Sequence, residues 1–227
     1  MKQKNPEIEV DGKKYLRIPV KTHVIMVGED IIDIVERYTK DIIKPGDIVF
    51  VTEKAVAISQ NRAYPVKSIK PGKLAVFLSG YVTKTKHGIG LGIPETMEMA
   101  LRECGVLRIL FAALVSFITK TFFKRKGDFY RIAGYRAASI DGPTPNTIPP
   151  YNEYVVLGPL YPDKVAKEMS NRIGVDVIIV DLNDLGGNIL GRSNKKLDKK
   201  KLYEILKDNP LGQSREQTPI GIIREIM

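Results

Sequence analysis

The chain has 227 residues, a length that suits one large domain or two small ones. Hydrophobic residues make up 43% and charged residues 27%, which is typical of globular proteins and excludes a disordered or fibrous chain. The formal net charge is +10, which favours phosphorylated or carboxylated partners. Cys104 is the only cysteine, so an internal disulfide framework and a multi-thiolate zinc site within one chain are excluded. We therefore expect a reducing, cytoplasmic environment.

The ends and the apolar segments of the chain give no sign of export. Residues Met1 to Pro6 are charged and lack the apolar centre of a signal peptide. The longest apolar run, Ile109 to Thr119, is shorter than the ~20 residues that a spanning helix needs, so we expect no transmembrane segment. We interpret Val106 to Phe123 as a core helix. The following Lys124-Arg125-Lys126 leaves an interfacial anchor as the alternative.

In the first third of the chain, apolar periodicity predicts alternating strands and helices. Residues Tyr15 to Thr22 alternate apolar and polar side chains, as a half-buried strand does. Apolar residues at helical spacing from Ile31 to Tyr38 predict a helix, and a Pro-Gly turn leads into a strand at Ile48 to Thr52. A second apolar stretch, Leu74 to Leu78, follows another Lys-Pro-Gly turn.

Later segments predict a strand-helix-strand unit. It comprises a strand from Tyr154 to Gly158, a helix from Pro162 to Arg172 and a strand beginning at Val175. Such a crossover normally places its two strands as parallel neighbours in one sheet. The predicted fold class is therefore mixed α/β (α+β) with a mixed sheet.

Changes in composition divide the sequence into three segments. Residues 1–14 form a polar leader and residues 15–193 the main domain. Residues 194–227 form a basic C-terminal extension, which we expect to pack on the main domain. A lysine-rich tract marks its start: Lys195, Lys196, Lys199, Lys200 and Lys201.

The strand that begins at Val175 ends in carboxylates, and these are the first candidate site residues. Asp181 and Asp184 follow a continuous β-branched run that suits a strand buried on both faces. Functional groups of open α/β sheets gather beyond the carboxyl ends of such strands. Two nearby carboxylates repel each other unless a cation, a shared proton or bulk water relieves the repulsion, and a hard cation with oxygen ligands such as Mg²⁺ is a common solution. A strand-end Asp next to a cap or turn Asp is the structural alternative.

A glycine-rich loop is the second candidate. Gly88 and Gly90 lie in the sequence His87 to Ile93, directly before a helix that begins near Pro94. Exposed backbone N–H groups at such a helix start can cradle phosphate. The pattern matches neither the Walker sequence nor the dinucleotide fingerprint, so a tight structural turn is an equal alternative.

The loop from Ser139 to Asn146 is the third candidate. Its prolines make it stiff, which would hold Asp141 and Asn146 in place as ligands. An ordinary Asp-Gly-Pro turn is the alternative.

Taken together, several of these segments resemble the coenzyme F420-0:gamma-glutamyl ligase family, over roughly Tyr15 to Gly191. The segments that carry the resemblance are Pro19 to His23, Gly46 to Val56, Gln60 to Arg62, Ala138 to Asp141, and Val180-Asp181. The resemblance implies an intertwined homodimer of mixed α/β architecture. It also implies an enzyme that uses GTP or ATP and a divalent metal to join L-glutamate to a carboxylate acceptor through a gamma-glutamyl amide.

The implied mechanism passes through an acyl phosphate. The acceptor carboxylate attacks the γ-phosphate of the nucleotide, and the amine of glutamate then displaces phosphate. Such chemistry depends on positioning and electrostatics rather than on a covalent nucleophile.

The resemblance also assigns site residues. Asp141 and Asp181 match metal-binding aspartates of the family, and Asn146 is a looser match. Thr22, His23, Val24 and Ile25 fall on the segment that approaches guanine nucleotide.

The chain departs from the family pattern at several positions. The resemblance implies nucleotide contacts at Glu53 and Lys54. Glu53 stands where Ser is usual in the family, and Ile58 stands where Lys is usual, so two of the family's nucleotide contacts are missing or rebuilt. Beyond Asp181 the sequence Leu182 to Gly187 replaces a Thr-Phe-Gly-Arg-like stretch. The stretch Asn209 to Pro219 has no assigned role.

The leading functional hypothesis is therefore a nucleotide- and metal-dependent ligase that adds L-glutamate to a carboxylate acceptor. The alternative is a non-catalytic phosphometabolite-binding or regulatory protein on the same scaffold. Specific nucleic-acid binding rests on net charge alone and is not expected.

Overall fold

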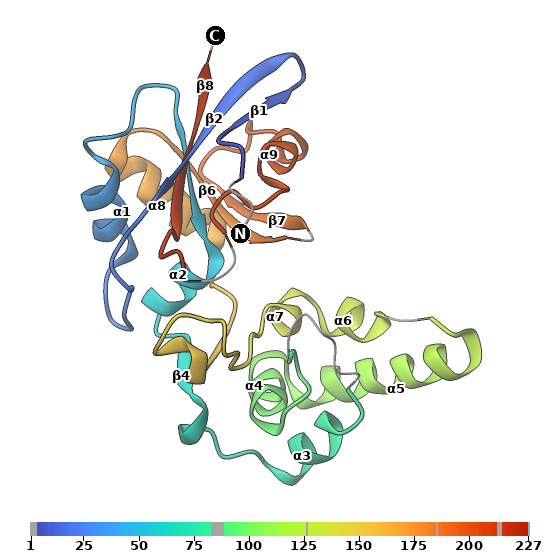
Figure 1. The fold of residues 1–227 in the computed structure, drawn as a ribbon. Helices are drawn as coiled ribbons and strands as arrows, with labels where there is room; N and C mark the ends of the chain where they lie inside the picture. The colour runs from blue at the N-terminus through green and yellow to red at the C-terminus, as the bar shows by residue number, and fades with distance from the viewer. Residues whose placement is uncertain (1–3, 83–88, 126, 185, 213–214, 227) are drawn as a thin grey trace. The chain divides into compact units, whose positions relative to one another are not determined.

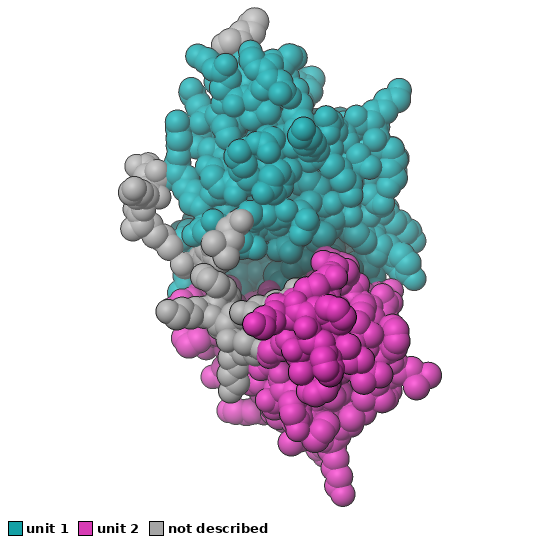
Figure 2. Space-filling model, turned by 90° about the vertical axis from the view of Figure 1, so that its right-hand side faces the viewer, with its two compact units in different colours: residues 1–61, 159–227 teal, residues 62–158 magenta. Residues whose placement is uncertain are grey.

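A computed structural model describes residues 4–82, 89–125, 127–184, 186–212 and 215–226. The chain divides into two compact units (Figures 1 and 2). Unit 1 contains residues 1–61 and 159–227, and unit 2 contains residues 62–158. Each unit is described by itself below.

Unit 1 is built on a mixed sheet flanked by helices (Figure 1). Among the described residues the sheet has six strands in the order β1-β2-β8-β3-β6-β7. The elements of this unit are β1 (Glu7–Val10), β2 (Lys13–Val20), α1 (Ile31–Thr39), β3 (Ile48–Thr52), α2 (Glu53–Ser59), α8 (Pro162–Ile173), β6 (Asp176–Asn183), β7 (Gly186–Arg192), α9 (Lys199–Leu206) and β8 (Ile220–Ile226).

The central strands are β8, β3 and β6. β3 pairs parallel with β6, with Thr52 opposite Val180, and antiparallel with β8. β-Branched residues suit strands that are covered on both faces, and Val177 to Val180 of β6 are fully buried. The strands predicted at Ile48 to Thr52 and from Val175 are thus confirmed.

The two faces of the sheet are covered by different helices. Phe50, Ile178 and Val180 belong to an apolar cluster with Leu202 and Leu206 of α9. Helices α2 and α8 contact the strands from the other side, and α1 packs against α8. Because side chains alternate along a strand, Asp181 points to the same face as Val177 and Ile179, away from the α9 cluster.

Unit 2 is mainly helical. Its elements are β4 (Ala63–Pro65), the 3₁₀ helix η1 (Val66–Ser68), α3 (Lys73–Ser79), α4 (Pro94–Cys104), α5 (Val106–Phe123), α6 (Asp128–Ala133), α7 (Tyr135–Ala138), the 3₁₀ helix η2 (Tyr151–Glu153) and β5 (Tyr154–Val156). Leu91, Met97, Ile109, Ile140 and Val155 are among the buried residues of its core. The apolar stretch Leu74 to Leu78 lies within helix α3.

The mixed α/β fold class is confirmed, but the predicted strand-helix-strand unit is wrong in its pairing. β5 pairs with β4 in a separate small sheet, whereas β6 pairs with β3 and β7. The chain leaves unit 2 after Gly158, so α8 does not return the chain to the sheet that contains β5. The parallel neighbour of β6 is β3, from much earlier in the sequence.

The interpretation of Val106 to Phe123 as a core helix is also wrong. The helix forms as predicted, but only 11% of it is buried, and Leu107 is 84% exposed. Its buried residues are Ile109 and Ala112. By length and composition it is the one helix in the described parts of the chain that is long and apolar enough to cross a membrane, which is weak evidence by itself.

Segments outside the expected main domain contribute to the sheet. The leader contains strand β1, which pairs with β2. The C-terminal segment contains α9 and strand β8, and β8 lies between β2 and β3. The last strand of the chain therefore lies near the centre of the sheet.

Candidate functional site

One edge of the unit 1 sheet gathers most of the nucleotide-binding candidates. β2 and β3 both end at this edge, and β8, antiparallel to both, begins there with Ile220 opposite Val20 and Val51. Thr52 lies opposite Val180, so Glu53 and Asp181 come directly after a matched pair of parallel strand positions. Carboxyl ends of parallel strands are where α/β sheets usually place functional groups.

The segment after β2 is held by its own polar contacts. The hydroxyl of Thr22, which is buried, donates to the carbonyl oxygen of His23 at 2.7 Å. His23 Nδ1 lies 2.9 Å from the hydroxyl of Tyr38, and Nε2 lies 2.9 Å from a carboxylate oxygen of Glu29. The N–H of Met26 donates to Glu29 at 2.6 Å and lowers the pKa of that carboxyl below its usual value. Both ring nitrogens of His23 are therefore engaged within the protein.

The remaining residues of this segment differ in exposure. Val24 is half-buried and Ile25 is buried. Ile25 thus anchors the segment, and a nucleotide base would reach the side chains of His23 and Val24 more easily.

Glu53 and Lys54 begin helix α2 immediately after β3. Glu53 is 4% exposed, and a carboxylate oxygen lies 2.9 Å from Nζ of Lys54. A carboxylate in the first turn of a helix is favoured by the helix dipole, and the ammonium group offsets part of its desolvation. Glu53, which stands where Ser is usual in the family that the sequence resembles, is therefore a buried carboxylate paired with an ammonium group.

The two candidate carboxylates at the C-terminal end of β6 have different surroundings. Asp181 lies within the strand opposite Asn188 of β7, because β6 continues to Asn183. Asp184 lies in the turn after β6, and its carboxylate forms an ion pair with Lys4 at 2.6 Å. The prediction from sequence ended this strand too early. The apolar run stops at Val180, where one face of the β6–β7 hairpin becomes accessible, but the strand itself continues to Asn183.

The C-terminal stretch whose role the sequence did not indicate reaches the same edge. The N–H of Thr22 donates to the carbonyl oxygen of Gln217, and the N–H of Thr52 donates to the carbonyl oxygen of Pro219, both at 2.9 Å. The hydroxyl of Thr218 donates to the carbonyl oxygen of Leu211 at 2.6 Å. The segment thus joins the ends of β2 and β3. In the sequence, a polar, proline-containing loop directly before the last strand was the signal that could have revealed this role.

In unit 2, Asp141 is fixed through its backbone. Its N–H donates to the carbonyl oxygen of Val156, and the N–H of Val156 donates to the carbonyl oxygen of Asp141, both at 2.9 Å. Ile140 is buried, whereas Asp141 is exposed. Asn146 is exposed in a turn that a 2.6 Å contact between the hydroxyls of Thr144 and Thr147 stabilises. The loop therefore presents both polar side chains to solvent from a fixed backbone.

The glycine loop meets the Asp141 loop at the start of α4. Gly90 has a φ of +51°, and a Cβ there would lie 2.9 Å from the hydroxyl of Tyr130. A Cβ on Gly142 would contact Thr96 of α4 at 3.1 Å. Ile93, at the N-cap position of α4, provides no side-chain cap. The close packing gives both glycines a structural role. Without a side-chain cap, backbone N–H groups at the start of α4 could also bind an anion.

The structure thus sorts the predicted site residues into two groups. Unit 1 contains Thr22, His23, Val24, Ile25, Glu53, Lys54, Asp181 and Asp184, and unit 2 contains Gly90, Asp141 and Asn146. Gly88 lies outside the described residues. In the described parts of the chain, no three His, Cys, Asp or Glu side chains are grouped so that they could hold a metal ion. A metal site shared by Asp141 and Asp181 therefore stays a prediction.

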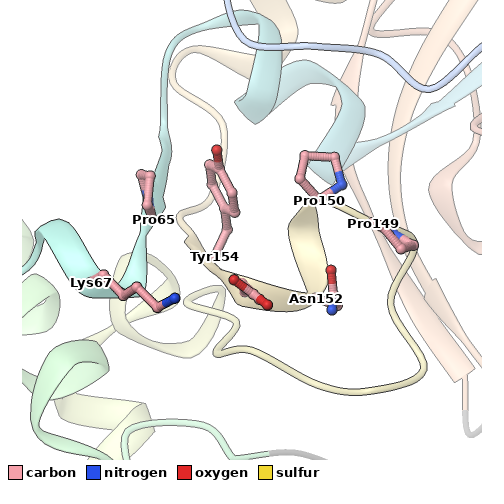
Figure 3. Close-up of a pocket in the computed structure, with 7 residues that line it drawn as sticks. Pro65, Lys67, Pro149, Pro150, Asn152 and Tyr154 are labelled. Atoms are coloured by element: carbon pink, nitrogen blue, oxygen red, sulfur yellow. The ribbon is translucent and has the colours of Figure 1, made fainter.

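Two surface hollows lie away from the predicted site residues. One of about 450 Å³ in unit 2 is lined by Lys67, Tyr154 and the prolines at 65, 149 and 150 (Figure 3). Another of about 470 Å³ lies where β3 and β6 begin, next to Ile48 and Asp176. None of the predicted site residues lines either hollow.

Comparison with known protein families gives a match over most of the chain. No curated protein matches the chain. The family model described as F420-0:Gamma-glutamyl ligase matches residues 19–190, a range that includes every predicted site residue. The protein therefore belongs to the F420-0:gamma-glutamyl ligase family.

Proposed function

We propose that the protein is a nucleotide- and metal-dependent ligase that adds L-glutamate to a carboxylate acceptor through a gamma-glutamyl amide bond. Membership of a ligase family supports an enzyme of this kind. The observation that carries the proposal is the edge of the unit 1 sheet. Thr22 and Glu53 follow the ends of β2 and β3 there, and Asp181 of β6 comes directly after Val180, the partner of Thr52.

The nucleotide, GTP or ATP, is proposed to bind at this edge. The segment Thr22 to Ile25 supplies backbone groups and the half-buried side chains of His23 and Val24. Lys54 is proposed to face the phosphates, although its ammonium group also pairs with Glu53. We expect the buried Glu53, in place of the usual Ser, to alter which nucleotide is preferred.

We propose that a hard cation binds together with the nucleotide. Asp141, Asn146, Asp181 and Asp184 offer only oxygen ligands, the type that Mg²⁺ and Mn²⁺ prefer. Mg²⁺ commonly uses one or two carboxylates plus substrate phosphates rather than a complete protein cage. When bound, the cation would neutralise charge on the transferred phosphoryl group.

The proposed reaction has two steps. The acceptor carboxylate attacks the γ-phosphorus, the nucleoside diphosphate leaves, and an acyl phosphate forms. The amine of glutamate then attacks the acyl carbon, loses a proton and expels inorganic phosphate. The residues of this chain contribute by orienting the reactants and excluding water, since such chemistry needs no covalent nucleophile.

The test is a reconstituted ligase assay with the purified protein. Magnesium or manganese, GTP or ATP, L-glutamate and a panel of carboxylate acceptors that includes F420-0 are combined, and products are analysed by mass spectrometry. We expect a product heavier by one glutamyl unit together with released phosphate, and neither when nucleotide, metal or glutamate is omitted. If no acceptor is glutamylated and neither nucleotide binds in the presence of metal, the proposal fails. Tight binding of a phosphometabolite without turnover would instead support the non-catalytic alternative.

A further inference from the structure

Helix α5 of unit 2 buries few of its residues, and most of its large apolar residues face outward. Ile109 and Ala112 are buried, and Ala113, Ser116 and Thr119 are half-buried. The outward stripe has helical spacing and contains large apolar residues: Leu107, Leu110, Phe111, Leu114, Phe117, Ile118 and Phe122. We call these seven residues the outer face of α5. A helix on the surface of a globular protein normally buries its large apolar residues and exposes its polar ones.

The outer face is too extensive to be a scatter of exposed apolar residues. Phe111 is 59% exposed and Phe117 is 65% exposed, and the helix of 18 residues is about 27 Å long. Contiguous apolar surface of this kind marks a contact with a protein or a membrane. Figure 1 shows the C-terminal half of α5 extending beyond the other helices of unit 2.

Positive charge accompanies this face. Residues 62–158 contain fourteen Lys and Arg against six Asp and Glu, so unit 2 carries a formal net charge of +8 out of the +10 of the whole chain. Lys120 lies in the last turn of α5, and Lys124 and Arg125 follow directly, all three exposed. Apolar residues beside basic ones are the combination by which helices lie in the interface of anionic membranes.

We propose that the outer face of α5 binds the surface of an anionic lipid bilayer, with the helix lying in the plane of the interface. A second copy of the chain is disfavoured as the occupant because it would bring the same excess of positive charge to the contact. A spanning orientation is disfavoured because Ile109 and Ala112 are part of the buried core of unit 2. The proposal concerns unit 2 and does not depend on the ligase reaction.

The chain contains no Trp, so one introduced indole reports on a single position. Phe117→Trp places the probe on the outer face of α5, and Tyr161→Trp is the matched control, since Tyr161 is 71% exposed in unit 1. Vesicles of phosphatidylcholine with and without 30% phosphatidylglycerol are added at about 0.15 M salt. We expect the indole emission of Phe117→Trp to shift to shorter wavelength and to be quenched by brominated acyl chains. The emission of the control variant should change little.

Binding is then measured by co-sedimentation of the full chain with the same vesicles. The variant Phe111→Gln/Leu114→Gln/Phe117→Gln keeps good helix formers on the outer face, and its helix content is checked by circular dichroism. We expect its affinity for anionic vesicles to fall at least tenfold. The affinity of Lys120→Gln/Lys124→Gln for anionic vesicles should fall about fivefold for each residue replaced. Wild type should bind vesicles without anionic lipid much less tightly.

The proposal is overturned if wild type does not bind anionic vesicles or if the triple variant binds as well as wild type. Sedimentation velocity is run on the same samples. A wild-type dimer that the triple variant converts to monomer, together with absent vesicle binding, would assign the outer face to a second copy instead.

Discussion

The backbone N–H of Thr22 donates a hydrogen bond to the carbonyl oxygen of Gln217 at 2.9 Å, although these residues lie near opposite ends of the chain. The contact makes the C-terminal loop part of the edge where the proposed nucleotide site lies. Thr218, next to Gln217, fixes the loop through its hydroxyl. A change at Thr218 therefore tests whether this loop contributes to nucleotide binding.

Thr218→Val keeps the shape of the side chain and removes the donor to the carbonyl oxygen of Leu211. We expect a stability loss of about 1 kcal/mol, the usual net value of one hydrogen bond, and weaker nucleotide binding by titration calorimetry. Ser68→Ala, which removes a hydroxyl bonded to Pro65 in unit 2, is the control and should leave nucleotide affinity unchanged. Lower stability with unchanged nucleotide affinity would limit the loop to a structural role.

Asp181→Asn tests the metal prediction. An amide keeps the size of the side chain but removes the anionic oxygen, so we expect Mn²⁺ affinity in the presence of nucleotide to fall at least tenfold. Asp33→Asn is the matched control, because Asp33 is a surface carboxylate of unit 1 that pairs with Arg172. Equal Mn²⁺ affinity of Asp181→Asn and wild type would remove Asp181 from the site.

Gly221→Ala tests the central position of β8. Gly221 lies opposite Phe50, and a Cβ there would overlap the Phe50 ring. Overpacking of this kind costs about 1–3 kcal/mol, which urea denaturation would measure. Gly80→Ala has room and an ordinary α-helical backbone, so it should be neutral or slightly stabilising. Equal stability of the two variants would contradict the packing of Phe50 on β8.

Gly90→Ala tests whether the glycine loop is structural, functional or both. The new Cβ meets the hydroxyl of Tyr130, whose pKa is raised by burial, and the φ of +51° adds strain. We expect lower thermal stability, part of which Tyr130→Phe should restore in the double variant. Nucleotide affinity of the folded protein separates the roles, because an unchanged affinity would leave Gly90 as a turn residue only.

Glu98 predicts a pH dependence of stability. The N–H of Gly72 donates to its carboxylate at 3.0 Å, and Arg102 Nε lies 2.8 Å away, so the pKa of Glu98 is lowered from its usual 4.5. A carboxyl with a lower pKa in the folded state stabilises the fold above its unfolded pKa. This contribution disappears as the pH falls below 4.5 through the lower folded pKa.

Urea denaturation of wild type and Glu98→Gln at pH 7 and at about pH 3 checks this expectation. The variant should be less stable than wild type at pH 7, and the difference should shrink at the lower pH. Glu95→Gln, on the same helix and outside this hydrogen-bonded group, controls for general acid effects. A difference between Glu98→Gln and wild type that does not change with pH would contradict the assignment.

Local patterns in the sequence determined the elements that depend on short-range chemistry. The strand Ile48 to Thr52, the helix at Ile31 and the helix that begins at Pro162 follow from apolar periodicity and from the preference for Pro in the first turn. The family and the mixed α/β class could also be inferred from sequence, because motifs such as Val180-Asp181 are contiguous.

Only the tertiary structure decided which strands pair and which helix faces are covered. Periodicity describes one segment at a time, so it did not show that β8 lies between β2 and β3 or that β5 belongs to another sheet. An apolar helix such as α5 has the same sequence signature whether the protein buries it or leaves it exposed. The edge that joins Thr22, Glu53 and Gln217 likewise depends on long-range pairing, which no local pattern encodes.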